Sequence, residues 1–393
     1  MYKKNIKSKY IFFIGMLCAF LWLYPVFNEP ELNVNLTFNQ RVLRTIYLFF
    51  LLPIVYRKLI FNIRFQKIIQ LFLIALLPSI FLASILSLNF SFIISTTVPI
   101  IFSILGILIL TSLEYIDFIH WLKAVSLISL IFFIIGIIKY GFVPSDYFGR
   151  PRVHFGFTHP VQTASAILAV FAPYTLLPNN LNKTTNLIFK LLLLIFLFLA
   201  QSINIFISVV IINVFSYFIK NNYNKYFVFF LSFFLFLSPF TIYFANYLPQ
   251  KYQDIINIFT SGRLNYFTET LLFEFKNDNI FNMLFGPMYE LRQLNLNTDV
   301  SRGFSFIDSV FFSFLFSFGF LGFISFLVFL YYLLINSYNK NKYSFQLITG
   351  LIFFYSADSQ GFTPNNLVYF SILAYIIKAN FKKHENESKF ILS

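Results

Sequence analysis

The stretch that decides the fold runs from residue 187 to residue 219 and reads LIFKLLLLIFLFLAQSINIFISVVIINVFSYFI. A bilayer core about 30 Å thick is crossed by roughly 20 apolar residues in a helix, so this run is too long for one ordinary span. The polar pair Gln201-Ser202 lies near its middle. We therefore expect two spans joined by a tight hairpin at this pair.

The whole chain is also rich in apolar residues. Of 393 residues, 58% are hydrophobic and 11% are charged, which leaves too few polar side chains to cover a soluble domain of this length. The sequence therefore predicts an all-α, polytopic integral membrane protein, with residues 1–393 forming a single transmembrane domain of about twelve helices. The apolar runs lie at about 10–27, 42–60, 68–88, 90–111, 121–139, 161–177, 186–200, 203–219, 226–246, 307–336, 344–357 and 365–380.

The amino-terminal stretch KKNIKSK precedes the first apolar run, as in a secretory signal, but no small-residue cleavage site follows it. We expect a retained first helix. Its Cys18 is the lone cysteine, so neither a disulfide framework nor a cysteine metal site is expected. The net charge of +14 comes from short loops rather than from one face interleaved with aromatic residues, which argues against a nucleic-acid partner.

Lysine follows the positive-inside rule when both termini are placed in the cytoplasm. Roughly 17 of the 20 lysines then lie on the cytoplasmic side or at its boundary. The inward basic residues include Lys3, Lys4, Lys7, Lys9, Arg57, Lys58, Arg64, Lys67, Lys183, Lys220, Lys225, Lys340, Lys342 and those from Lys378 to Lys389.

Arginine has a different distribution, because five of the nine arginines fall in two outward segments, at about 143–160 and 247–306. A topology signal would not favour arginine there, whereas a planar, permanently charged fork suits bidentate contacts with phosphate. We infer an anionic, phosphorylated substrate at the outer face. The five residues are Arg150, Arg152, Arg263, Arg292 and Arg302.

The first outward segment leads into an apolar run and reads GRPRVHFGFTHPVQTA from residue 149 to residue 164. Thr158 can cap a helix and Pro160 fits its first turn, so the sixth span is expected to begin here with its amino end outward. The positive end of the helix dipole would then face Arg150, Arg152, His154 and His159, and together they predict an anion site. Interfacial arginines that reach lipid headgroups, with histidines that cap the helix, are an equally weighted reading. Zinc binding by the two histidines is weaker, because no cysteine or carboxylate cluster accompanies them.

The second outward segment, at about 247–306, is expected to be a large structured loop. Its stretch TSGRLNYFTETLLFEF, residues 260–275, has Thr260 or Ser261 as a cap and Arg263 in the first turn of an amphipathic helix. A second anion site is possible here, as is an ordinary surface arginine. Glu269 follows Arg263 on the same predicted helix and joins the candidate residues, although most acidic side chains of this loop fit a solvated face.

The late stretch FIDSVFFSFLFSFGFLG, residues 306–322, begins another predicted span. Asp308 lies in its first turn, where a carboxylate usually stabilises the helix; the alternative is a base or an anchor for an arginine. Gly319 and Gly322 permit close helix packing or a bend. Asp358, in a short outward turn before Thr363-Pro364, is a weaker candidate for the same cavity.

Several common nucleotide-binding and catalytic motifs are absent from the sequence. It contains no GxxxxGK[ST], no HExxH, no GxSxG and no DxD-like pair in a soluble domain. ATP hydrolysis and the use of nucleotide sugars are therefore not expected.

The order of these features resembles the O-antigen and capsule repeat-unit polymerases, often called Wzy-type, which share a membrane fold with the O-antigen ligases. The matching pieces are RPRVHFGFTHPVQTA before a middle span, QSIN at a hairpin, TSGR opening a helix in the large outer loop, and FG followed by FIDSVFFSFLFSFGFLG. They cover roughly residues 140–325. Asn204 stands where relatives often have an arginine, which puts that position in doubt, and residues 247–306 lack the histidine typical of ligases. The polymerase branch is therefore favoured.

The resemblance implies a glycosyltransferase at the outer face of a bacterial plasma membrane. Polyprenyl-diphosphate-linked oligosaccharides would be donor and acceptor, and a chain-length regulator is a conceivable partner. Arg152 and Arg263 are the expected diphosphate ligands, neutralising the leaving group without a metal or cofactor. His159 is favoured as the polar partner at the reacting centre, with His154, Glu269 and Asp308 as other proton acceptors. A ligase, a flippase for lipid-linked oligosaccharide and a structural scaffold remain the alternatives.

Overall fold

The protein is described by a computed structural model in which almost all of the described residues are helical. These residues are 2–27, 46, 48–61, 76–87, 97–146, 151–157, 160–176, 182–220, 247–254, 280–285, 310–340, 342–357 and 366–381.

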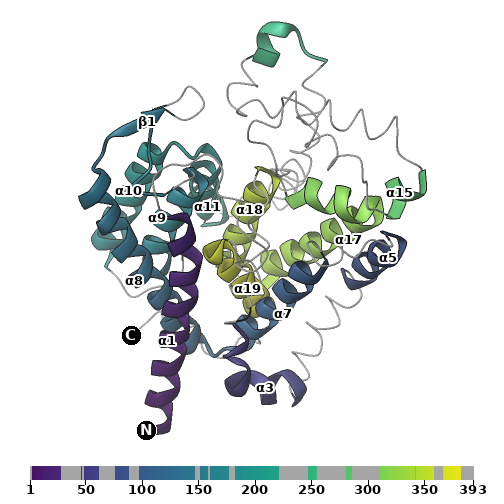
Figure 1. Cartoon of the computed structure of the whole chain (residues 1–393), viewed down its shortest axis with the longest axis horizontal. Helices are drawn as coiled ribbons and strands as arrows, with labels where there is room; N and C mark the ends of the chain where they lie inside the picture. Colours follow the sequence, from purple (N-terminus) through teal and green to yellow (C-terminus); the bar gives the residue numbers. More distant parts are fainter. Residues whose placement is uncertain are drawn as a thin grey trace.

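The helices pack side by side into one bundle, and a two-stranded antiparallel sheet lies at one of its ends (Figure 1). In chain order the elements are α1 (Tyr2–Leu23), η1 (Tyr24–Val26), α3 (Leu52–Phe61), α5 (Leu77–Ser87), α7 (Val98–Ser112), α8 (Tyr115–Tyr140), β1 (Pro144–Asp146), β2 (Pro151–Val153), α9 (Pro160–Thr175), α10 (Lys183–Ala200), α11 (Ile203–Lys220), α15 (Ile280–Phe285), α17 (Val310–Lys340), α18 (Lys342–Ala357) and α19 (Leu367–Phe381).

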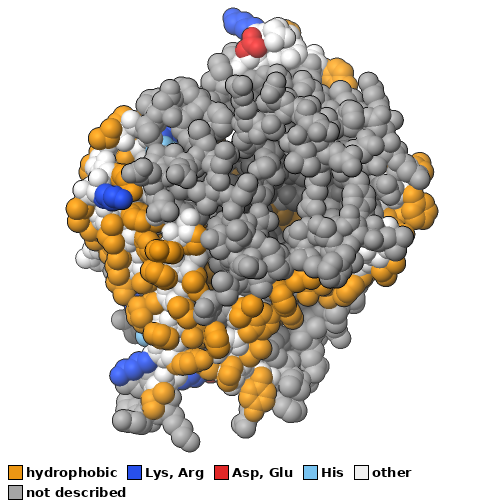
Figure 2. All heavy atoms as spheres, viewed as in Figure 1, with side chains coloured by type: hydrophobic (Ala, Val, Ile, Leu, Met, Phe, Trp, Pro, Cys, Tyr) orange, Lys and Arg blue, Asp and Glu red, His pale blue; other side chains and the backbone are white. Residues whose placement is uncertain are grey.

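Every predicted apolar run that falls on described residues coincides, wholly or in part, with a helix; the run at 226–246 lies outside them. Four helices are long and apolar enough to cross a membrane, which fits an all-α membrane protein. Their outward faces are apolar, and Figure 2 shows hydrophobic side chains over much of the described surface on one face. The large loop predicted at 247–306 is described only at 247–254 and 280–285.

The predicted break at Gln201-Ser202 is confirmed. Helix α10 ends at Ala200, and Gln201 adopts the left-handed conformation with φ 47° and ψ 33°. A left-handed residue is a common way for a helix to end, and the N–H of Gln201 donates to the carbonyl of Phe198. Helix α11 then begins at Ile203, one residue beyond the break.

Helices α1 and α8 run in the same direction. The Lys7 ammonium lies against the Asp117 carboxylate near the amino ends of both helices, and the rings of Phe27 and Tyr140 meet at the opposite ends. In a membrane, two parallel helices need an odd number of crossings between them. The predicted order of spans has three between α1 and α8, at about 42–60, 68–88 and 90–111.

Helices α9 and α19 run against α8. The Ser126 hydroxyl of α8 donates to the carbonyl of Val170 near the carboxyl end of α9. The Trp121 indole donates to Ser371, and Phe118 contacts Tyr375 further along α19, so the two sequences pass in opposite senses. The bundle therefore has two distinct ends.

We call these the lysine end and the arginine end. The lysine end contains the amino ends of α1, α8 and α10 and the carboxyl ends of α17 and α19, where Ser337 donates to Asn380. The arginine end contains the sheet and the amino end of α9, and it lies opposite the chain's amino terminus (Figure 1). Described lysines at the lysine end include Lys3, Lys4, Lys7, Lys9, Lys183, Lys340, Lys342 and Lys378.

Helix α17 folds back on itself at Gly319, whose φ of 64° and ψ of −171° lie outside the helical region. On a straight helix Phe314 and Phe326 would be about 18 Å apart. Their ring centroids instead lie 4.2 Å apart in a stacked pair. The run predicted as one span is thus a short buried arm, starting at Val310, packed against a longer arm that ends at Lys340.

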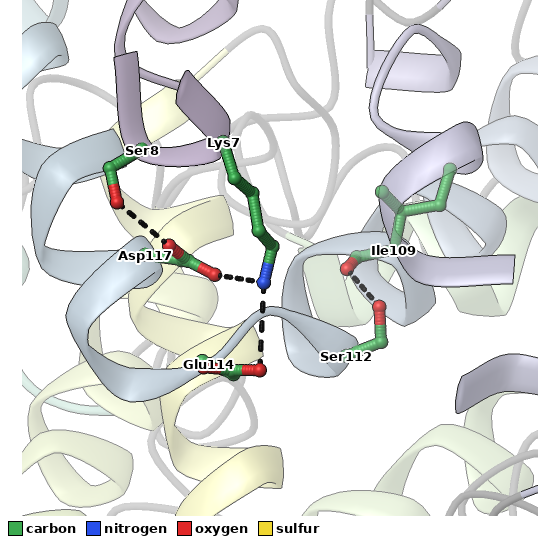
Figure 3. A network of polar contacts seen from close by, with 6 residues as sticks. All are labelled: Lys7, Ser8, Ile109, Ser112, Glu114 and Asp117. Atoms are coloured by element: carbon green, nitrogen blue, oxygen red, sulfur yellow. Dashed lines mark hydrogen bonds and ion pairs between the residues drawn. The ribbon is translucent and has the colours of Figure 1, made fainter. Parts of the chain in front are cut away.

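An ion pair between the half-buried Lys7 and the buried Asp117 fixes the register of α1 against α8 at the lysine end (Figure 3). The Lys7 ammonium lies 2.6 Å from the Asp117 carboxylate and 3.5 Å from that of Glu114. The Ser8 hydroxyl donates to the other oxygen of Asp117 at 3.4 Å. Asp117 also occupies the first turn of α8, where the helix dipole stabilises a negative charge.

Replacing Lys7 by methionine is expected to lower the free energy of unfolding by about 2 kcal/mol, because Asp117 would remain buried without its cation. Lys9→Met is the matched control, since Lys9 is exposed on the same helix. Adding Asp117→Asn to Lys7→Met should recover part of the loss by removing the orphaned charge. Thermal unfolding in detergent measures these changes, and equal melting temperatures for Lys7→Met and Lys9→Met would contradict the assignment.

Candidate functional site

The sheet at the arginine end places Arg152 directly after α8. Helix α8 ends at Tyr140, and Gly141 follows with φ 65°, its N–H donating to the carbonyl of Ile137. The chain then forms β1 and β2, in which Ser145 is the register partner of Arg152. The sequence did not predict these strands, because strands of three residues carry no detectable hydrophobic alternation.

The turn after β2 is fixed by two hydrogen bonds to one carbonyl. The carbonyl of His154 accepts from the N–H of Phe157 at 3.0 Å and from the Thr163 hydroxyl of α9 at 3.1 Å. Phe155 and Gly156 both have positive φ values, 48° and 80°. A non-glycine residue with positive φ is uncommon and needs support from its surroundings.

Aromatic packing supplies this support. The buried ring of Phe155 contacts Phe133, Phe142 and Phe196 at centroid distances of 4.9, 5.5 and 6.2 Å. The ring of Phe157 contacts Phe27 at 5.3 Å, and the two residues also form an isolated antiparallel bridge. The turn is therefore held between α8, α10 and the end of α1, which gives Arg152 and His154 a rigid base.

Arg152 and His154 are both buried, with 8% and 6% of their surface exposed. Burial lowers the pKa of His154, and the positive charge of Arg152 lowers it further, while a hydrogen bond with the backbone at Phe157 opposes the shift. His154 is therefore neutral at neutral pH, and one of its ring nitrogens can accept a proton or a hydrogen bond. Arg152 beside it adds a guanidinium with five N–H donors suited to phosphate.

The lowered pKa of His154 predicts how the stability of the protein changes with pH. Histidine in an unfolded chain takes up a proton near pH 6.5, whereas folded His154 does so only at lower pH. In that window the unfolded state binds more protons, so stability falls as the pH falls. We expect the melting temperature of the wild type in detergent to decrease more than that of His154→Gln between about pH 7.5 and about pH 5.5. Parallel melting curves for the two proteins would contradict the burial of a neutral imidazole.

The structure brings together two of the residues selected from the sequence. Arg152 and His154 are two positions apart, the spacing that puts side chains on one side of an extended segment. Helix α9 begins at Pro160, which confirms the predicted start of this helix. The other selected residues lie outside the described parts of the chain: Arg150, His159, Arg263, Glu269, Arg292, Arg302 and Asp308, and also the cap Thr158 and Asp358.

Two further polar residues join α9 and α19 at the arginine end of the bundle. The Asn366 carboxamide donates to the Ser165 hydroxyl of α9 at 2.7 Å, and its oxygen accepts from the N–H of Tyr369, which caps α19. Both residues are almost fully buried. Thr163 therefore joins α9 to the β2 turn, and Ser165 joins the same helix to α19. Sequence reasoning missed these roles, because a small polar residue at a helix start has the same local pattern with or without a tertiary partner.

Within the described ranges, no group of three His, Cys, Asp or Glu residues lies close enough to hold a metal ion. No protein-family model, curated protein or solved structure matches the chain.

Proposed function

We propose that the protein is a polysaccharide repeat-unit polymerase, a glycosyltransferase that joins polyprenyl-diphosphate-linked oligosaccharides into O-antigen or capsular polysaccharide. The observation that carries the proposal is the pair formed by Arg152 and His154. A buried guanidinium lies beside a neutral imidazole at the arginine end of the bundle. A diphosphate is a good leaving group once its charge is neutralised, and a fixed guanidinium provides this without reorganisation.

The proposed orientation places the arginine end outside the plasma membrane and both termini in the cytoplasm. The described lysines of α1, α10, α17 and α19 gather at the other end, which agrees with the positive-inside rule. The parallel pair α1 and α8 agrees with the three crossings proposed between them. The two outward segments, about 143–160 and 247–306, would then face the same compartment.

The proposed reaction is a displacement at the anomeric carbon of the donor. A hydroxyl oxygen of the acceptor sugar forms the new bond to that carbon, while the bond from the carbon to the diphosphate oxygen breaks. The polyprenyl diphosphate leaves with the electron pair, held by Arg152 and Arg263, with Arg150, Arg292 and Arg302 as further ligands. The hydroxyl proton passes to a base, for which His159 is the first candidate and His154, Glu269 and Asp308 are the others.

Deletion in the native host, followed by electrophoresis of surface polysaccharide, tests the proposal. We expect long chains to disappear while a single repeat unit remains attached to its final acceptor. Loss of even that unit would contradict the polymerase and indicate a ligase or a flippase instead. Restoration of long chains by the wild-type protein in trans controls for effects on neighbouring genes.

A further inference from the structure

Helix α19 is joined to another helix at each of its ends by a buried asparagine. At the arginine end, the Asn366 carboxamide donates to the Ser165 hydroxyl of α9 at 2.7 Å. At the lysine end, the Asn380 carboxamide accepts from the Ser337 hydroxyl of α17 at 3.0 Å and donates to the carbonyl of Leu333 at 3.2 Å. Both asparagines are 1% exposed, so the loss of either carboxamide should cost a similar free energy. The two links differ in the part of the protein that they hold.

The link at the arginine end reaches the first turn of α9. The Ser165 hydroxyl accepts from Asn366 and donates to the carbonyl of Val161 at 2.7 Å. Thr163 lies between these two positions of α9, and its hydroxyl donates to the carbonyl of His154 at 3.1 Å. A series of short hydrogen bonds therefore connects α19, through α9, to the turn after β2.

The amino end of α19 is a firm base for this link. The ring of Tyr369 stacks on Phe354 of α18, with the ring centroids 3.7 Å apart. The Tyr369 hydroxyl donates to Ser208 of α11 at 3.4 Å, and Ser208 donates to the carbonyl of Gly350 of α18 at 2.9 Å. The N–H of Tyr369 also donates to the Asn366 oxygen, which turns the NH2 group of that carboxamide toward α9. Asn366 thus holds α9 against a helix that α11 and α18 keep in place.

The link at the lysine end holds a different part of the bundle. Asn380 lies fourteen residues beyond Asn366, about 21 Å further along α19. Its partners, Ser337 and Leu333, belong to the long arm of α17. Neither of these two bonds involves α9 or the sheet. Loss of this link should therefore destabilise the bundle without moving the candidate site.

We propose that Asn366 is a positioning residue of the candidate site, which keeps Arg152 and His154 in place by fixing the first turn of α9 against α19. The inference rests on the proposed polymerase function, because an effect on catalysis requires that this site is the reacting centre. Asn366 acts through Ser165 and Thr163 and not by contact with the substrate. A site whose supporting residues are loosened loses rate even when its own side chains are intact.

Chain growth measured against the amount of folded protein tests this role. The variants are expressed in the deletion strain, and folded protein is quantified by size-exclusion chromatography of a fluorescent fusion. Electrophoresis follows the rate at which long polysaccharide chains appear after induction. We expect Asn366→Ala to lower this rate about tenfold per folded protein, because the turn that carries His154 can shift. Asn380→Ala should lower the melting temperature by a similar amount and leave the rate per folded protein almost unchanged. Equal slowing by the two variants, or normal growth with Asn366→Ala, would overturn the proposal.

Combined substitutions show whether Asn366 acts through Ser165. Ser165→Ala removes a single hydroxyl oxygen and should also slow chain growth, so it replaces Asn366→Ala if that variant fails to fold. If the two residues act as a unit, the double variant should be no slower than the slower single variant. Ser337→Ala with Asn380→Ala is the matched pair at the lysine end, and its non-additivity should appear in the melting temperature and not in the rate. Additive losses of rate at the arginine end would contradict the link.

A measurement that needs no activity separates this inference from the proposed function. The part of the drop in melting temperature between about pH 7.5 and about pH 5.5 that depends on His154 is the difference between the wild type and His154→Gln. This difference should shrink when both proteins also carry Asn366→Ala, because a loosened turn lets water reach the imidazole, and it should persist with Asn380→Ala. If it shrinks while the wild type makes no long chains in the native host, the polymerase function is wrong and the link to the turn stands. If it persists in full with Asn366→Ala, the link itself is wrong, whatever the protein catalyses.

Discussion

Replacing Arg152 by alanine should abolish long polysaccharide chains while leaving the protein in the membrane at normal levels. Loss of one fixed donor to a developing negative charge typically lowers the rate about 100- to 1,000-fold. Arg152 suits this role because it is buried on a strand whose following turn is held by Phe155, Phe157 and Thr163. The expected result is an electrophoretic ladder truncated to very short chains.

Arg152→Lys tests the geometry separately from the charge. Lysine keeps the positive charge but loses the planar fork that binds two phosphate oxygens at once, so a partial defect is expected. Lys139→Ala is the control, because Lys139 is an exposed cation near the same end of the bundle, 4.9 Å from the Tyr140 ring. Chains of normal length from a stably expressed Arg152→Ala protein would remove Arg152 from the proposed site.

Local signals in the sequence predicted most of the helices. The length of an apolar run and the residues at its ends are enough to locate a span, as the break at Gln201-Ser202 and the start of α9 at Pro160 show. Boundaries next to charged residues were less accurate. Helix α8 begins at Tyr115 rather than near residue 121, because the charge of Asp117 is compensated by Lys7 of another helix.

Features that depend on distant contacts could not be predicted in this way. Gly319 and Gly322 indicated either a bend or close packing, and the stacking of Phe314 on Phe326 decides in favour of the bend. Gly322 then fits because the Cβ of Phe318 already occupies the space that a side chain at residue 322 would need. A local stretch of sequence does not reveal these contacts, because they form only when the chain reverses direction at Gly319.

The candidate site also combines features that local sequence signals predict with features that depend on distant contacts. The sequence indicated Arg152 and His154, because arginine collects in the two outward segments and both residues precede the amino end of a predicted span. It did not indicate Thr163 or Asn366, whose roles come from the carbonyl of His154 and the hydroxyl of Ser165. These links are recognised only when helices far apart in the sequence are seen together.

Replacing Gly136 by alanine should destabilise the protein and displace the site in one step. A Cβ at this position would overlap the carbonyl oxygen of Phe155 and lie 2.7 Å from its carbonyl carbon. Both atoms belong to the backbone of the turn that follows Arg152 and His154, so no side-chain rotation can relieve the clash. We expect the free energy of unfolding to fall by about 3 kcal/mol, at the upper end for overpacking a core.

Gly141→Ala is the control for this prediction. Its Cβ would meet nothing within 4 Å, so the substitution costs only the backbone strain of a φ of 65° with a ψ of −152°, about 2 kcal/mol. Thermal unfolding should therefore rank the proteins as wild type, Gly141→Ala and Gly136→Ala. Chain length on electrophoresis should fall with Gly136→Ala even at a temperature where the protein stays folded, because the turn must move away from α8. Similar melting temperatures for both variants would show that the turn is not held against Gly136, and the rigid base inferred for Arg152 would then be wrong.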